Sequence, residues 1–410
     1  MATNAGVVTF PSYTASAARA RPLDHARTTV NPVIRAALYL FVLSIPFEIP
    51  NRTLPVEIPT ITGCIFLLAT LLRPGLSYRA IPGAALWFCV YLWMFGLSTL
   101  FNQSTETVLV LNLFLEMLQL LLIFWAASNL LRDRRVLRGT LITLAIAVAL
   151  RGALQVLGIG ATAHEVWTGG ERITAFGQNA NLSAIILSVG TLILLNLRPK
   201  LVTWPIAGVA TLAIIQTGSR GGLFCLAAGI LVWAITSGRT IGARIRGVFV
   251  GLFVLGAIAF GVLRDDMLRE RLLAAEGGSL AGRENIYPAT LSMISEKPIL
   301  GWGPIENQFE IGARIGEEKK DKRDAHNIVL DLMSSTGILG TIPFLIGWAL
   351  CVGSAWRARR GSCGALPLAL LVVTFVGCMS GTWIASKILW LTFSIAAATG
   401  ATAPPKEALS

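Results

Sequence analysis

The sequence predicts an all-α, polytopic membrane protein of about 12 transmembrane helices with one large loop outside the membrane. Three observations support this fold class. Hydrophobic residues make up 54% of the 410 residues, and charged residues only 14%. Mean hydropathy is +0.68, and a soluble fold of this size could not bury so much apolar surface. Basic residues also gather in alternate links between the apolar runs, as they do in multi-pass membrane proteins.

The apolar runs define the expected helices. In hydrocarbon every backbone amide must find a partner within its own segment, so apolar runs of about 17–25 residues predict spanning helices. The expected spans are residues 33–49, 58–72, 83–101, 107–130, 136–157, 181–197, 201–217, 221–238, 247–263, 327–352, 363–382 and 386–402. Twelve spans place both termini on the same side of the membrane.

Lys and Arg in the links orient the bundle, because positive residues near helix ends resist translocation. With the N-terminus in the cytoplasm, nineteen Lys and Arg fall on the cytoplasmic side. The short links on the other side hold four: Arg52, Arg172, Arg220 and Lys387. We therefore expect both termini in the cytoplasm and residues 264–325 as a periplasmic loop, because long loops are exempt from the charge rule.

The chain divides into three expected parts. Residues 1–30 hold three arginines and lack the apolar core of a cleavable signal peptide, so they predict a disordered cytoplasmic arm. Residues 31–402 form one transmembrane helical domain, and residues 403–410 a cytoplasmic tail. The loop at 264–325 carries ten basic and twelve acidic residues, which indicates a solvated surface. Its middle has helical apolar spacing and predicts short helices over the mouth of the bundle.

Composition and motifs argue against several function classes. The formal charge of +12 does not indicate nucleic-acid binding, because the basic residues lie between apolar runs and not on one surface. Phosphate-binding glycine loops and the H-E-x-x-H zinc motif are absent. The six cysteines lack metal-type spacing and are expected to be small buried hydrophobes. We expect neither a metal nor a cofactor.

Arg220 is the first candidate site residue, in the short link Thr217-Gly218-Ser219-Arg220-Gly221-Gly222. An arginine on the outer side opposes the positive-inside trend, and holding it at the membrane surface requires a partner. The glycines let a ligand approach the backbone, and the guanidinium fork suits a phosphate. The alternative is an arginine that reaches to lipid phosphate.

Arg283 is the second candidate. It precedes a stretch with helical apolar spacing and so lies near a helix start. Its guanidinium and the free backbone amides there would both face an anion. A salt bridge with Glu284 or with a neighbouring carboxylate is the alternative.

His326 is a candidate base, in Asp324-Ala325-His326-Asn327 where the charged loop meets the tenth span. A neutral imidazole there could accept a proton from an incoming hydroxyl. Asp324 is placed to orient the ring, whereas Asp331 falls on another face of the helix. The alternative is a hydrogen-bonded histidine at the membrane interface.

Arg172 is a fourth candidate, shortly before the sixth span. It belongs to a segment rich in amides, whose side chains would donate to a sugar or a phosphate. Asn179 and Asn181 in that segment are instead natural helix caps.

Together these motifs resemble the O-antigen ligase and O-antigen polymerase superfamily. The resemblance rests on Ser219-Arg220-Gly221-Gly222, on Gly282-Arg283 followed by Ile299-Leu300-Gly301-Trp302-Gly303-Pro304, and on Ala325-His326-Asn327 running into Thr336-Gly337-Ile338-Leu339-Gly340. It covers residues 170–350 well and the remainder only in helix count and polarity. Each motif is short, and their order and common face make the joint match specific.

The resemblance implies a metal-independent, inverting glycosyltransferase of the bacterial inner membrane. Its donor would be a glycan linked to undecaprenyl diphosphate, and its acceptor the lipid A-core or a growing polysaccharide at the periplasmic face. Arginines matching Arg220 and Arg283 would hold the diphosphate, and Arg172 would support them. The histidine matching His326 would be the base toward the acceptor hydroxyl.

Two other functions stay open at this point. A repeat-unit polymerase needs the same diphosphate clamp and the same base, so these motifs do not separate it from a ligase. A secondary transporter would line a pathway with intramembrane charges, for which Glu116 and Asp331 are the candidates.

Overall fold

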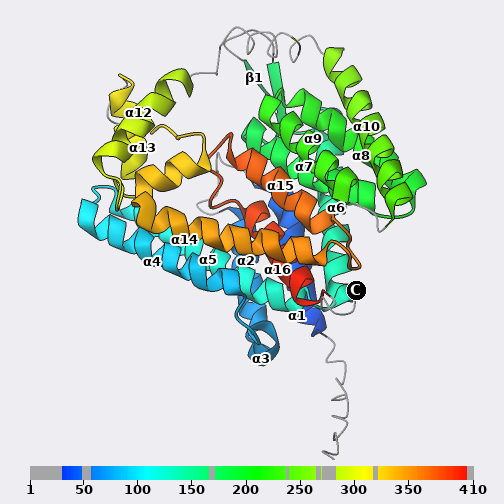
Figure 1. Ribbon diagram of the computed structural model, residues 1–410, viewed down its shortest axis with the longest axis horizontal. Helices are drawn as coiled ribbons and strands as arrows, with labels where there is room; N and C mark the ends of the chain where they lie inside the picture. The colour runs from blue at the N-terminus through cyan, green and yellow to red at the C-terminus, as the bar shows by residue number, and fades with distance from the viewer. Residues whose placement is uncertain are drawn as a thin grey trace, which may run out of the picture.

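The computed structural model consists almost entirely of helices (Figure 1). It describes residues 30–48, 57–165, 171–236, 240–264, 269, 283–316 and 322–403. An apolar helix lies at each of the twelve predicted spans. The predicted arm and tail fall outside the described residues, apart from residues 30 and 403.

The first half of the bundle contains α1 (Pro32–Ser44) with the short 3-10 turn η1 (Ile45–Phe47), α2 (Ile58–Thr70), α3 (Pro74–Ser77), α4 (Gly83–Asn102), α5 (Thr107–Leu130) and α6 (Arg134–Val156). The ends of these helices follow local chemistry. The side chain of Asn31 accepts a hydrogen bond from the amide of Val33 and caps α1, and Asp133 caps α6 in the same way through Arg135.

The second half contains α7 (Ala180–Asn196), α8 (Lys200–Gln216), α9 (Arg220–Thr236), α10 (Ile241–Leu263), α12 (Arg283–Glu296), α13 (Glu306–Arg314), α14 (Ile328–Ala358), α15 (Leu366–Cys378) and α16 (Lys387–Ala401). Between α6 and α7 the chain forms an antiparallel hairpin of β1 (Ala161–Glu165) and β2 (Glu171–Ala175). The all-α expectation was therefore wrong for this link, where each strand satisfies the backbone groups of the other.

Five helices are long and apolar enough to cross a membrane by length and composition: Gly83–Asn102, Thr107–Leu130, Arg134–Val156, Arg244–Leu263 and Ile328–Ala358. The other seven apolar helices are shorter, at 10–17 residues. The chain is thus a multi-pass, helical membrane protein, and its number of crossings remains a prediction.

Two apolar cores meet at α15 and α16. One core joins these helices to α1, α6, α7, α8 and α9, and the other joins them to α4, α5 and α14. Figure 1 shows α15 between the α7–α10 group and the pair α4 and α14, which run side by side. Because α16 packs on both sides, it buries residues around its whole circumference. By contrast, α10 lies at the edge of the bundle and leaves most of its surface exposed.

Not all cysteines are buried. All six are free, and Cys225, Cys351 and Cys378 are buried as expected. Cys64 and Cys89 are exposed, so the prediction was wrong for them. Spans of a membrane bundle are apolar on their outward faces too, and hydropathy alone does not show which face packs inward.

Helix α14 is broken at Gly337, which has φ 61° and ψ −165°. The break frees backbone groups, and the segment from Pro298 to Pro304 fills it. The amide of Trp302 donates to the carbonyl of Ser334 at 2.7 Å, and the amide of Ile338 donates to the carbonyl of Pro298 at 2.9 Å. A Cβ at Gly337 would lie 2.2 Å from the carbonyl oxygen of Ile299, so only glycine fits.

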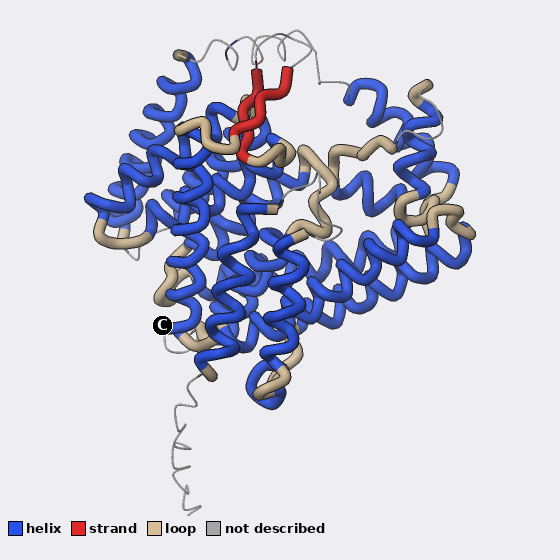
Figure 2. Tube along the Cα trace, turned by 180° about the vertical axis from the view of Figure 1, so that it is seen from behind, coloured by secondary structure: helices blue, strands red, loops and turns tan. Residues whose placement is uncertain are grey.

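Helices α12 and α13 form a small cap beside this break. Ile286, Met293 and Ile311 are buried there, with Trp302 packed against them. This confirms the short helix with apolar spacing that was expected from residue 283 onward. Both views place α12, α13 and the β1–β2 hairpin toward one end of the bundle, and α3 toward the other (Figures 1 and 2).

Candidate active site

Arg220 opens α9 after a three-residue link from α8. Gly218 turns this link with φ 59°, a conformation that glycine adopts without strain. Ser219 then caps α9, because its Oγ accepts from the amide of Gly222 at 3.0 Å. The guanidinium of Arg220 thus emerges half-buried at the positive end of a helix, which favours anions.

Arg172 holds that link in place from strand β2. Its Nε donates to the carbonyl of Thr217 at 2.8 Å, and its Nη2 donates to Oδ1 of Asn181 at 3.2 Å. Oγ of Ser219 donates to the same oxygen at 2.8 Å. Arg172 and Asn181 together fix the backbone just before Arg220, which gives Arg172 a positioning role.

The two candidate caps of α7 have different roles. Oδ1 of Asn179 accepts from the amides of Asn181 and Leu182, so the capping alternative is confirmed for Asn179. Asn181 instead uses its side chain to join Arg172 to Ser219.

Arg283 is the first residue of α12, and its side chain reaches the link between α15 and α16. Its Nη2 donates to the carbonyl of Ser380 at 3.0 Å. A Cβ built on Gly221 would lie 3.0 Å from Oγ of the same serine. The positive charges of Arg283 and Arg220 act on each other. Within the part of the chain that the structure describes, Arg283 forms no salt bridge with Glu284 or with another carboxylate.

His326 lies half-buried directly before α14, with a backbone φ of 50°. A left-handed conformation is rare for a residue other than glycine and costs about 1–3 kcal/mol, so the surrounding fold must enforce it. Ala325 is fully buried on one side, and Asn327 caps α14 on the other. Such strain is typical of functional positions.

The pKa of His326 is lowered from its ordinary value, chiefly by burial. The carboxylate of Asp324 opposes this effect, and the positive charges of Arg283 and Arg323 add to it. The imidazole is therefore neutral near neutral pH and able to accept a proton. Asp331 is bound elsewhere, since Nδ2 of Asn307 donates to its Oδ1 at 3.0 Å.

The turn Met379–Ser380 between α15 and α16 is the common neighbour of these residues. Ser380 contacts both Gly221 and Arg283, and Nδ2 of Asn327 donates to Sδ of Met379 at 3.8 Å. The structure therefore brings together three segments that are far apart in the sequence. Sequence analysis missed this turn, because no residue in it carries a charge or a recognisable motif.

Sequence analysis also missed Arg151, inside the apolar helix α6. Its side chain is fully buried, and its Nη2 donates to Oγ of Ser183 at 2.6 Å. Its Nε and Nη1 have no hydrogen-bond partner among the described residues. Ser183 is two residues from Asn181, so Arg151 adds positive charge beneath the link that carries Arg220. An arginine within an apolar run was the available signal.

A second buried cluster surrounds Lys387, the first residue of α16. Its Nζ donates to Glu48 at 3.0 Å, to Glu57 at 2.7 Å and to Glu116. These pairs join α16 to α5 and to the segment before α2. Glu116, the charge that a transport pathway would need, is thus used in an internal ion pair.

The protein is therefore a helical membrane protein in which segments that carry arginines and a neutral histidine meet at one turn. This arrangement suits a phosphorylated ligand. Residues 205–345 match the family model described as O-antigen ligase. An O-antigen ligase of Pseudomonas aeruginosa is 30% identical over 216 residues, which are 50% of this chain and 48% of that relative. The chain therefore spans about half the length of the curated relative it matches.

These matches confirm that this segment is similar to the O-antigen ligase family, as the resemblance predicted. The matched segment runs from α8 into α14 and contains Arg220, Arg283 and His326. Arg172 lies before it.

Proposed function

We propose that this protein is an O-antigen ligase-type glycosyltransferase. It moves a glycan from undecaprenyl diphosphate to a hydroxyl of lipid A-core at the periplasmic face of the inner membrane. The observation that carries the proposal is that Arg283 and the neighbours of Arg220 and His326, Gly221 and Asn327, all contact the turn Met379–Ser380. The positive charge of Arg283 also acts on Arg220 and on His326, and all three residues lie within the segment similar to the O-antigen ligase family.

In the proposed reaction, His326 acts as the base, and Arg220 and Arg283 stabilise the leaving group. The acceptor hydroxyl gives its proton to the neutral imidazole of His326 while its oxygen bonds to the anomeric carbon of the glycan. The bond from that carbon to the diphosphate breaks, and its electron pair leaves with the diphosphate oxygen. Attack opposite the leaving group inverts the anomeric centre. The guanidiniums of Arg220 and Arg283 stabilise the growing negative charge on the diphosphate.

The proposal assigns the positive charge at the leaving group to arginines and not to a divalent metal. The guanidiniums of Arg220 and Arg283 supply the positive charge that the leaving diphosphate requires, and Arg172 and buried Arg151 support them. Transfer by the purified protein should therefore persist at its full rate in excess EDTA. A loss of transfer that magnesium or manganese restores would overturn this part of the proposal.

Complementation of a deletion strain tests the proposal. Arg220→Ala, Arg283→Ala and His326→Ala should each abolish attachment of glycan to lipid A-core while the protein still inserts into the membrane. Arg314→Ala is the matched control, because Arg314 is held by Glu296 and Glu310 in the cap. Near-normal surface polysaccharide in all three variants would refute the site.

The same strain separates ligase from polymerase. If the protein is a ligase, its loss leaves complete polymer on the lipid carrier. If it is a polymerase, single repeat units accumulate or appear on lipid A-core.

A further inference from the structure

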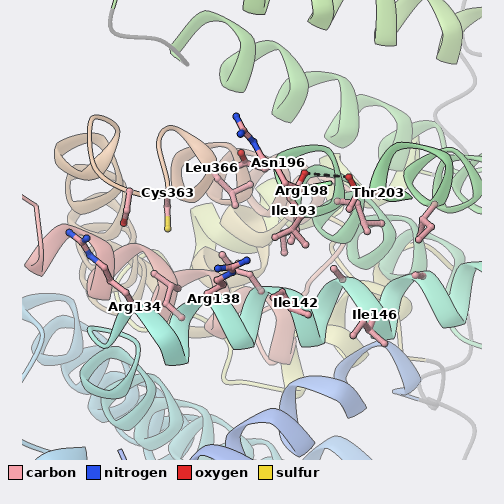
Figure 3. Close-up of a pocket in the computed structure, with 18 residues that line it drawn as sticks. Arg134, Arg138, Ile142, Ile146, Ile193, Asn196, Arg198, Thr203, Cys363 and Leu366 are labelled. Carbon is pink, nitrogen blue, oxygen red and sulfur yellow. Dashed lines mark hydrogen bonds between the residues drawn. The ribbon is translucent and has the colours of Figure 1, made fainter. Parts of the chain in front are cut away.

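A groove lies between α6, the end of α7, the start of α8 and the start of α15 (Figure 3). It has a volume of about 590 Å³. Ligand pockets of proteins commonly fall between about 300 and 1,000 Å³, so one small ligand fits. The groove is at the other end of α7 from Asn181, and a helix of 17 residues separates the two ends by about 25 Å.

One end of the groove is basic. Arg134 and Arg138 line it from α6, and Arg198 lines it from the link between α7 and α8. All three are exposed, and none hydrogen-bonds through its side chain to another of the described residues. Among the described residues, no carboxylate lines the groove. Asp133 caps the helix that carries Arg134, so the groove relies on the guanidiniums and not on a helix terminus.

The other end is apolar and follows the same face of α6. Ile142 and Ile146 continue the four-residue spacing of Arg134 and Arg138, so the four side chains form one row about 18 Å long. Ile142 is 36% exposed and Ile146 is 56% exposed. Figure 3 shows these residues along α6, with Ile193 on the facing wall.

We propose that this groove binds one anionic phospholipid, with its phosphate against Arg134, Arg138 and Arg198 and one acyl chain along Ile142 and Ile146. The row of side chains changes from cationic to apolar in one direction, as a phospholipid changes from headgroup to chain. A free phosphate would leave the apolar half unused, and an apolar peptide would leave three arginines uncompensated. Basic pockets between transmembrane helices are known to suit anionic headgroups.

Lipid retention on the full-length protein tests the proposal. The protein would be purified from nanodiscs of phosphatidylethanolamine and phosphatidylglycerol, and its retained lipid would be counted by native mass spectrometry. Wild-type protein should retain one phosphatidylglycerol in preference to phosphatidylethanolamine. Arg134→Gln, Arg138→Gln and Arg198→Gln combined should weaken that retention about tenfold or more. Arg138→Gln alone should weaken it less and covers the case in which the triple variant misfolds.

The control variant combines Arg73→Gln and Arg79→Gln, which remove exposed arginines outside the groove and should leave retention unchanged. Equal loss in this control, or equal retention of phosphatidylethanolamine by the wild type, would refute a specific site. Displacement of the lipid by inorganic phosphate would identify a phosphate site instead. Preferential displacement by undecaprenyl phosphate would identify the polyprenyl carrier as the occupant.

Discussion

Helix α7 has an arginine cluster near each end, and the two clusters are built differently. Near its N-terminus, Arg172 and Arg283 are held by hydrogen bonds to Thr217, Asn181 and Ser380. Near its C-terminus, the arginines of the groove are exposed. They extend into solvent from the regular helix α6 and from the link between α7 and α8. The first arrangement fixes the direction of each guanidinium, whereas the second supplies charge without direction. Stabilising a transition state requires fixed direction, and attracting a mobile headgroup does not.

The backbones differ in the same sense. The active-site end has positive φ at Gly218, His326 and Gly337, and its strained turns are supported by neighbouring segments. The groove is lined mainly by α6, whose backbone is regular over its whole length. The regular helix α6 thus contrasts with the positive-φ residues where chemistry is proposed. Five substitutions test this contrast.

The largest effect is expected for His326→Ala. Loss of a general base lowers the rate of proton transfer by about 10²–10⁴-fold, so kcat should fall by that factor. Binding of the undecaprenyl-diphosphate glycan should persist, because the arginines remain. Steady-state kinetics and donor binding on reconstituted protein measure the two effects. A variant that loses binding but keeps kcat would assign His326 to binding.

Arg172→Lys should have the second largest effect on activity. Lysine keeps the charge but cannot bond Thr217 and Asn181 with one planar fork, and hydrogen bonds to charged groups contribute about 1.5–3 kcal/mol. We expect kcat to fall about tenfold or more with an unchanged pH profile. Arg314→Lys in the cap is the control. An effect on KM alone would show that Arg172 binds substrate directly.

Gly337→Ala should destabilise the protein by about 1–3 kcal/mol, because alanine is strained at φ 61° and its Cβ would meet the carbonyl of Ile299. The displaced segment also supports α12, so transfer should fall as well. Gly96→Ala in α4 is the control, since nothing lies within 4 Å of its Cβ. Thermal unfolding in detergent measures the difference. Equal melting of both variants would contradict the packing described here.

Asp324→Asn should move the acid limb of the pH–rate profile to lower pH. The carboxylate raises the pKa of His326, so its removal lowers that pKa and keeps the imidazole neutral in more acidic solution. Arg323→Gln should move the limb in the opposite direction, because Arg323 lowers the same pKa. Shifts in the same direction for both variants would show that His326 does not set the limb.

Arg138→Lys should have the smallest effect. An exposed charge without a fixed partner contributes at most about 1 kcal/mol, so retention of phosphatidylglycerol should stay within about twofold of the wild type. The matched Arg220→Lys should lower transfer about tenfold or more, because a lysine does not reproduce a fork directed at diphosphate. Similar losses in both variants would remove the contrast between the two clusters.

Much of the fold was predictable from the sequence, because its main signal is one-dimensional. Each apolar run became a helix, and the residues at Asn31, Asp133 and Asn179 cap helices as their chemistry predicts. The hairpin β1–β2 was not predicted, because its alternating pattern is short and lies between two long apolar runs. The sequence also did not show which face of each helix packs inward. Cys64 and Cys89, which are exposed, are examples.

The charged residues of the candidate site could be predicted from the sequence. The residues that hold them in place could not. Arg220 was singled out because cations are rare in the short outer links, Arg283 because it lies near a helix start, and His326 because histidines are few. The turn at Ser380 and the buried Arg151 were missed, since the first lacks a charge and the second was counted as part of an apolar span.

The sequence by itself determined that helices form, which stretch of the chain each one occupies to within several residues, and which side chains carry charge, because these depend on residues close together along the chain. Only the tertiary structure decided that the segments carrying Arg220, Arg283 and His326 meet at Met379–Ser380, and that α6 and α7 leave a groove of about 590 Å³ between them. Those arrangements depend on packing between distant segments, and in apolar helices many faces are chemically equivalent until a neighbour covers one of them.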